Sequence, residues 1–163
     1  MRATHFDSRG RVKMVDVGLK QPSRRVAVSR GRVVMSHVAF QALKQGKIEK
    51  GEAIAVAKAA GILAAKRTAE LIPLCHPIPV DCIKIDFRFL GGGRSVEIES
   101  EVRTTDKTGV EMEALTAVAI ASLTLYDMVK ALDRSIVIEG IRLIKKAGGK
   151  SGTYVWDGKE KRS

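Results

Sequence analysis

The feature that most constrains the fold of this chain is a pair of alternating apolar and polar runs joined by glycines. "CIKIDFRFL" begins at Cys82 and "SVEIESEVRT" begins at Ser95, with "GGGR" between them. Successive side chains of a strand point to opposite faces of a sheet, so each run matches a strand. Glycine supplies the backbone freedom that a tight chain reversal needs. The two runs are therefore predicted to form an antiparallel hairpin.

A long helix is predicted after this hairpin. "GVEMEALTAVAIASLTLYDMVKALD" keeps a helical period for about seven turns. Thr108, followed three residues later by Glu111, fits a capping box, and the helix dipole favours Glu111 and Glu113 near the N-terminus. Capping accounts for Glu111 only, which leaves Glu113 open to a functional role. The expected apolar stripe consists of Leu115, Val118, Ser122, Leu125 and Val129.

The remaining segments complete an α+β pattern. Residues 25–35 have β-branched side chains on both sides of an "SRG" break and predict a strand or a short hairpin. A short helix is expected between the N-cap candidate Ser36 and Gly46, and an alanine-rich, closely packed helix from near Lys50 toward Leu71. "SIVIEGIRLI" is a final strand. This order matches a ferredoxin-like (split βαβ) fold, with an antiparallel sheet, helices on one face and one added helix.

The positive charge is concentrated at the two ends of the chain. Residues 1–32 contain nine Lys/Arg against two acids, residues 142–163 contain seven against two, and residues 33–141 contain thirteen against fourteen. Basic arms suit an anionic partner such as nucleic acid, a polyphosphate or an acidic protein surface. At 163 residues one compact domain is expected. The expected organisation is a basic N-terminal arm at 1–24, a single ferredoxin-like domain at 25–147 and a Gly/Lys-rich C-terminal tail at 148–163.

Composition favours a soluble, cytoplasmic protein. Cys75 and Cys82 are the only cysteines, and no apolar signal segment is present at the N-terminus, which points to a reducing cytosol without a disulfide. The apolar stretch at 53–74 is interrupted by three basic residues, so it is unsuited to span a membrane.

The loop "LIPLCHPIPV" is the most unusual in the chain, because three prolines fix the backbone around Cys75 and His76. A rigid loop can position side chains for function, although a lone histidine more often serves as a structural hydrogen-bonding group. Cys75, His76 and Cys82 provide three soft ligands for zinc, but their spacing lacks the paired ligands of known zinc sites. We therefore expect no metal site here and leave both roles of His76 open.

Asp127 and Lys130 lie three positions apart near the end of the long helix and share a face. One interpretation is a helix salt bridge worth about 0.2 to 0.5 kcal/mol. The other is a buried pair with pKa values shifted toward proton transfer, because the neighbours of Asp127 are largely apolar. Further along, "KKAGGKSG" combines glycines with Lys145, Lys146 and Lys150 in a pattern that suits a phosphate, although it is not a Walker motif.

Several of these stretches together resemble the cyclic pyranopterin monophosphate synthase family, the C proteins (MoaC) of molybdenum cofactor biosynthesis. The resemblance covers roughly residues 14 to 154 and is most specific in "LIPLCHP" and "KTGVEMEALTA". It also includes "MVDVGLK", "KGEAIAVAKAAGILAAKRTAE", "LYDMVKA" and "VIEGIRLIKKAGGKSG". The chain departs from the common family pattern at Glu52, where Asp is frequent, and at Ala147, where Ser is frequent. Neither change removes a proton-transfer group.

The resemblance implies a ferredoxin-like subunit in a homo-hexamer, a trimer of dimers with active sites at the dimer interface. It also implies a lyase that rearranges 3′,8-cyclo-7,8-dihydro-GTP to cyclic pyranopterin monophosphate and releases pyrophosphate. General acids, general bases and triphosphate ligands suffice for this reaction. No tightly bound cofactor is expected, and Mg²⁺ could accompany the triphosphate.

The same resemblance assigns roles to individual residues. Asp127, Lys50 and Lys130 match the catalytic residues of the family. The substrate-binding residues that it implies are Leu74, Cys75, His76, Glu111, Met112 and Glu113, with Arg25, Lys20, Lys66 and Lys146 as triphosphate or structural contacts.

A small basic nucleic-acid-binding protein is the alternative. Aromatic residues make up only 4% of the chain, too few for a platform on which bases stack. The candidate site also includes Glu111, Glu113 and Asp127, which would repel phosphate. The nucleotide triphosphate that the family resemblance implies therefore remains the expected ligand, with neither nucleic acid nor membrane as a partner.

Overall fold

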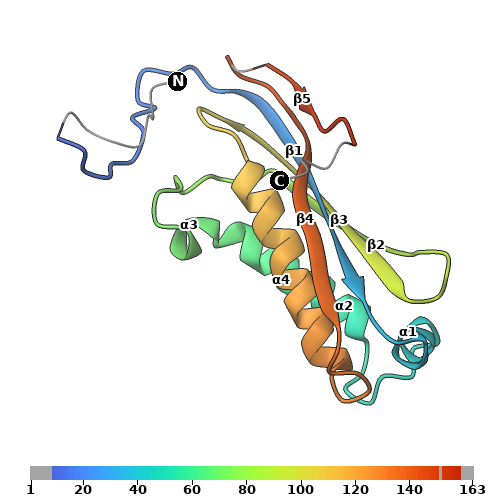
Figure 1. Ribbon diagram of the computed structural model, residues 1–163. Helices are drawn as coiled ribbons and strands as arrows, with labels where there is room; N and C mark the ends of the chain where they lie inside the picture. Colours follow the sequence, from blue (N-terminus) through green and yellow to red (C-terminus); the bar gives the residue numbers. More distant parts are fainter. Residues whose placement is uncertain (1–8, 151, 159–163) are drawn as a thin grey trace.

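The computed structural model describes residues 9–150 and 152–158. An antiparallel sheet forms one layer, and helices cover one of its faces (Figure 1). The order of strands across the sheet is β2-β3-β1-β4-β5. The strands are β1 at Ser23–Val34, β2 at Cys82–Phe89, β3 at Ser95–Asp106, β4 at Val137–Ala147 and β5 at Tyr154–Val155.

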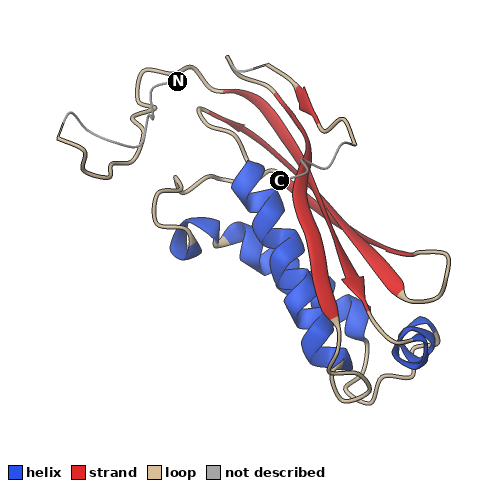
Figure 2. Ribbon diagram, in the orientation of Figure 1, coloured by secondary structure: helices blue, strands red, loops and turns tan. Residues whose placement is uncertain are grey.

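The helical layer is built mainly from two helices that run side by side. α4 packs against β1, β3 and β4, and α2 packs against α4 and β2. Figure 2 shows this separation of helices from strands. The arrangement confirms the predicted ferredoxin-like α+β fold. The helices are α1 at His37–Lys44, α2 at Ala53–Lys66, α3 at Thr68–Leu71 and α4 at Glu111–Val129.

The predicted hairpin is confirmed as β2 and β3. Phe89 pairs with Val96 beside the turn, and the amide of Leu90 donates to the carbonyl of Ser95 at 3.0 Å. Gly92 and Gly93 adopt positive φ angles of 89° and 65°, which other residues rarely enter. This backbone requirement explains the glycine run in the sequence.

β1 is one continuous strand, so the hairpin alternative for residues 25–35 is wrong. Arg30 and Gly31 stay paired with β3, while the pairing with β4 changes register around them. A Cβ atom at Gly31 would lie 2.8 Å from a methyl group of Val118 and 3.0 Å from a side-chain carbon of Ile141. The "SRG" break therefore marks a close approach of α4 and β4 to β1.

The alanine-rich helix is shorter than predicted and is broken near its end. It begins at Ala53, after Gly51 with a φ of 98°, and α3 follows as a separate turn beyond Arg67. The hydroxyl of Thr68 donates to two carbonyls of the preceding turn, at 3.3 and 3.1 Å. Such side-chain bonds compete with the helical ladder, which accounts for the break.

The two predicted helix caps have opposite outcomes. Ser36 caps α1, because its hydroxyl accepts a hydrogen bond from a first-turn amide, as predicted. The capping box at Thr108 is wrong, since α4 begins at Glu111 and Val110 occupies the cap position without a side-chain bond. The carboxylate of Glu111 pairs instead with Lys146 at 3.4 Å.

The core lies between the sheet and the α2–α4 pair. Gly61 of α2 sits where a Cβ atom would lie 2.8 Å from the carbonyl oxygen of Ala117 and 2.6 Å from Ile85. The close helix packing predicted from the alanine content is therefore confirmed. Leu115 is only partly buried. The other four residues of the predicted stripe are fully buried, namely Val118, Ser122, Leu125 and Val129.

α4 has a length and hydropathy that would also suit a membrane span. It is the only helix of the described residues to meet both criteria, with 19 residues and a mean hydropathy of 1.4 in its most apolar window. Of that window, 56% is buried inside the fold. A core helix of a soluble protein has the same properties, so the apolar character of α4 is explained by its position against the sheet.

The C-terminal region contains a strand that the sequence did not predict. β4 continues to Ala147, and β5 pairs with its end through Lys146 opposite Tyr154 and Lys145 opposite Val155. Two residues are too few for a recognisable alternating pattern, so β5 is evident only from its pairing.

Candidate active site

Lys50, Asp127 and Lys130 form one cluster at the C-terminal end of α4. The Nζ of Lys50 lies 2.9 Å from Oδ2 of Asp127, and the Nζ of Lys130 lies 2.7 Å from Oδ1. Lys50 also donates to the backbone carbonyl of Asp127 at 2.9 Å. One carboxylate thus holds two lysine ammonium groups that lie far apart in the sequence.

The electrostatics of this cluster do not fit the predicted alternative of a buried Asp127–Lys130 pair with pKa values shifted toward proton transfer. Hydrogen bonds from Lys130 and Lys50 lower the pKa of Asp127 to about 2. The side chain of Asp127 is 54% exposed, so the interpretation of a buried pair with proton-transfer pKa values is wrong. At neutral pH Asp127 is a permanent carboxylate that orients the two lysines.

A second group of predicted residues lies at the N-terminal end of α4. Glu113 is 3% exposed, and its Oε2 atom has no hydrogen-bond partner within the described part of the chain. Burial raises the pKa of Glu113 to about 7, and the charge of Glu111 adds to the shift. Met112, between them, is partly buried. Glu113 is therefore poised to change its protonation state near neutral pH.

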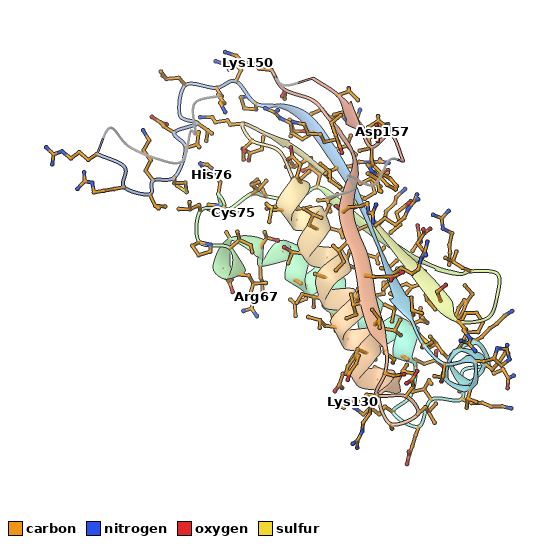
Figure 3. The ribbon with its side chains drawn as sticks, viewed as in Figure 1. Arg67, Cys75, His76, Lys130, Lys150 and Asp157 are labelled. Atoms are coloured by element: carbon orange, nitrogen blue, oxygen red, sulfur yellow. The ribbon has the colours of Figure 1, made fainter. Side chains whose placement is uncertain are left out.

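The proline-rich loop joins this second group. Burial raises the pKa of the Cys75 thiol, and the charge of Glu113 contributes. The Nε2 of His76 donates to the carbonyl of Val15 at 2.8 Å, which ties the loop to the N-terminal segment. Leu74 is partly buried beside them. In Figure 3, Cys75 and His76 lie near one end of α4 and Lys130 lies at the other.

Metal-binding side chains do not cluster in the described part of the chain. No three His, Cys, Asp or Glu residues there lie close enough together to hold a metal ion. Cys75 and Cys82 are both free thiols.

A basic cavity of about 810 Å³ opens beside Glu111. Arg25 donates to the carbonyls of Asp106 and Lys107 at 3.2 Å each, which fixes the loop before α4. The sequence analysis gave Lys107 no role, although it is the first residue of the motif "KTGVEMEALTA". The basic residues that line the cavity are Lys20, Arg25, Lys107, Lys146 and Lys150.

Lys66 lies apart from that cavity. It lines a smaller hollow of about 310 Å³ together with Arg67, Glu113 and the prolines Pro77 and Pro79. Lys66 and Arg67 therefore share a hollow with Glu113. The sequence analysis gave Arg67 no functional role.

The predicted residues therefore form two groups at opposite ends of α4. Glu113 and Asp127 are fourteen residues apart, or about 21 Å at a rise of 1.5 Å per residue. A single ring system cannot contact both ends within one chain. Lys50 and Lys130 belong to one end, and the Cys75–His76 loop belongs to the other.

Comparison with known proteins identifies close relatives. The model of the MoaC family matches residues 14–149. Cyclic pyranopterin monophosphate synthase of Heliobacterium modesticaldum is 55% identical over 152 residues, covering 93% of this chain and 96% of the relative. The synthases of Thermomicrobium roseum and Desulfitobacterium hafniense are 55% identical over 151 residues and 50% identical over 155 residues. These matches cover 93% and 95% of this chain, and 91% and 94% of the respective relatives.

Proposed function

The chain belongs to the MoaC family, and from this premise we propose that it is a cyclic pyranopterin monophosphate synthase of molybdenum cofactor biosynthesis. Its substrate would be 3′,8-cyclo-7,8-dihydro-GTP and its products cyclic pyranopterin monophosphate and pyrophosphate. The observation that carries this proposal is the cluster in which Asp127 holds the ammonium groups of Lys50 and Lys130 within 2.9 Å. The related synthases and the cluster support the same lyase chemistry.

The rearrangement involves no net redox change, so proton donors and acceptors must carry it. As an ammonium group a lysine can donate a proton to a ring nitrogen, and as a neutral amine it can accept one from a ribose hydroxyl. Lys50 and Lys130 would supply these two roles. Asp127, with a pKa of about 2, stays ionised and keeps both amines oriented. Positioning by a fixed carboxylate aligns donor and acceptor with the reacting atoms.

Glu113 would bind the guanine-derived ring. A carboxylate accepts hydrogen bonds from ring and exocyclic N–H groups, and a protonated carboxyl group can also donate one. The unpartnered Oε2 and the pKa of about 7 suit either role. Leu74, Cys75, His76 and Met112 would complete the contacts to the ring.

The basic cavity would hold the triphosphate. Lys20, Arg25 and Lys146 supply positive charge, and backbone amides of Gly148 and Gly149 can approach phosphate oxygens. We assign no tightly bound cofactor, and Mg²⁺ would enter with the triphosphate. The enzyme would act in the cytoplasm, where Cys75 and Cys82 stay reduced.

Each active site would need two chains. The distance of about 21 Å between the ends of α4 lets a second copy, packed antiparallel, bring its Asp127 end beside Glu113. Apolar side chains on the outer helical face support such packing, since Leu63 and Leu123 are each 55% exposed and Val56 is 44% exposed. Three such dimers would form the hexamer that the family resemblance implies.

The experiment that tests this function is direct. The purified protein should release pyrophosphate from the cyclised dihydro-GTP, and it should not retard nucleic acid at moderate salt. Retardation without pyrophosphate release would favour the nucleic-acid-binding alternative, for which the comparisons give no support.

A further inference from the structure

Trp156 anchors the C-terminal strand to the sheet. It is the only tryptophan in the chain, and the guanidinium carbon of Arg142 lies 4.5 Å from the centroid of its ring. Its amide donates to the carbonyl of Ile144 at 2.8 Å. The stack lies on the sheet face opposite the helices, because Arg142 pairs with Arg30 and the helix-facing positions of β1 are its buried ones.

The anchor is important because β5 is a very short strand at the edge of the sheet. β5 contains two residues, and Tyr154 and Val155 are 43% and 61% exposed. Such a short edge strand is marginal without a packed side chain. The stack of Trp156 on Arg142 supplies a packed side-chain contact directly after this strand.

The segment just before β5 forms a wall of the basic cavity. Gly148, Gly149 and Lys150 all line it, and Lys146 both lines it and pairs with Tyr154 of β5. A Cβ atom at Gly148 or Gly149 would collide with the backbone of Arg24 or the side chain of Arg25, so the two glycines press directly against β1. The position of this wall therefore depends on both of its ends, β4 on one side and β5 on the other. In Figure 3, Lys150 is labelled before β5 and Asp157 after it.

We propose that Trp156 is a positioning residue for anion binding. By stacking on Arg142 it holds β5 against β4, and through β5 it keeps Lys146, Gly148, Gly149 and Lys150 at the wall of the cavity. The identity of the anion as the substrate triphosphate rests on the proposed function. The anchoring itself requires only that the cavity binds a polyphosphate.

Binding of inorganic tripolyphosphate to the full-length protein tests the anchor without turnover. Trp156→Ala should raise the Kd measured by calorimetry about threefold to tenfold, because the aromatic contact is lost. Trp156→Phe should restore part of the affinity, since Phe stacks on a guanidinium more weakly than Trp. Val155→Thr, an exposed β-branched substitution in the same strand, is the matched control and should leave Kd unchanged. In the wild-type protein, tripolyphosphate should also protect the single tryptophan from acrylamide quenching.

Kinetics separate positioning from a general structural role. Trp156→Ala should raise KM by the same factor as the Kd while kcat and the thermal midpoint stay near the wild-type values. Unchanged Kd and KM, or a loss confined to kcat, would show that Trp156 does not position the cavity. A wild-type protein that binds no tripolyphosphate would also overturn the inference. If tripolyphosphate binding depends on Trp156 but the protein does not turn over the cyclised nucleotide, the proposed function is wrong and the positioning role of Trp156 is supported.

Discussion

At the residue scale, one carboxylate and two lysines carry the chemistry that we propose for the site. Asp127 has two oxygen atoms and receives a different ammonium group on each, from Lys50 and Lys130. The cluster is exposed on this chain, so the lysines can reach a ligand without any rearrangement of the core. Substitution of these lysines should therefore change proton transfer without changing the stability of the fold, so the two effects can be measured separately.

Lys50→Ala and Lys130→Ala should each reduce turnover about 10²- to 10⁴-fold, because a positioned acid or base is lost. The fold should stay intact, since neither side chain is part of the core. The measurement is the rate of pyrophosphate release, with circular dichroism and thermal unfolding as checks of structure. Lys58→Ala, which removes a surface lysine 4.0 Å from Asp86, is the matched control. Near-normal rates in both active-site variants would exclude these lysines from the mechanism.

Glu113 should make stability depend on pH. Its pKa is about 7 in the folded protein, against 4.5 for an ordinary glutamate. Between these values the unfolded chain has lost a proton that the folded chain keeps, so the free energy of unfolding should fall as pH rises from about 4.5 to 7. Glu113→Gln cannot ionise at this position. Its free energy of unfolding should therefore fall over this pH range by about 1 to 3 kcal/mol less than that of the wild-type protein.

Urea unfolding of both proteins at pH 5 and pH 8 measures this difference. At pH 8 the glutamine variant should be the more stable of the two, because it buries no charge. Glu70→Gln, an exposed carboxylate in the neighbouring turn, is the control and should follow the wild-type curve. Parallel curves for the wild-type protein and Glu113→Gln would mean that Glu113 titrates normally.

At the element scale, the contact between α2 and α4 depends on the absence of a side chain. Gly61 is fully surrounded, and its neighbours Ala117 and Ile85 leave no room for a methyl group. Glycine normally weakens a helix by about 1 kcal/mol relative to alanine, so its presence inside α2 indicates a packing requirement. This contact sets the separation of the two helices that carry the active-site residues.

Gly61→Ala should therefore destabilise the protein by about 1 to 3 kcal/mol, despite the better helix propensity of alanine. Chemical denaturation gives the free energy of unfolding. Ala59→Gly, at an exposed position of the same helix, is the companion variant and should cost about 1 kcal/mol through propensity alone. A Gly61→Ala protein that is more stable than wild type would show that α2 can move away from α4.

At the scale of the whole molecule, the two ends of α4 are the important feature. They carry the two groups of predicted site residues, about 21 Å apart along the helix. The exposed apolar residues Leu63 and Leu123 lie on the helical layer between them. A two-fold axis across this layer would produce two equivalent sites from two chains.

Complementation tests this arrangement. Glu113→Ala and Asp127→Ala chains should each be inactive alone, and mixing them under conditions of subunit exchange should restore up to roughly a quarter of wild-type activity per chain. The reason is that random pairing makes half of the dimers mixed, and each mixed dimer has one intact site of two. Exchange is verified with differently tagged chains. A mixture that exchanges subunits and remains inactive would contradict the shared site.

Sequence alone determined the local elements of this protein. Alternation and a glycine turn predicted β2 and β3, and helical periodicity predicted α4, because these patterns depend on neighbours close in the chain. The motifs around Cys75, Glu113 and Asp127 indicated the family, which the comparisons confirmed. The pairing of Asp127 with Lys130 was visible as well, since both lie on one helix face.

Tertiary structure decided the rest. Lys50 reaches Asp127 across 77 positions, and no local pattern specifies such a contact. No local pattern specifies the burial of Glu113 or the two-residue strand β5 either. The predicted capping box also fails for a tertiary reason, because Glu111 pairs with Lys146 of β4 instead. Periodicity reveals which face of an element is apolar, whereas packing decides which element lies against that face. The pKa values follow from this packing, because exposure keeps Asp127 ionised and burial raises the pKa of Glu113.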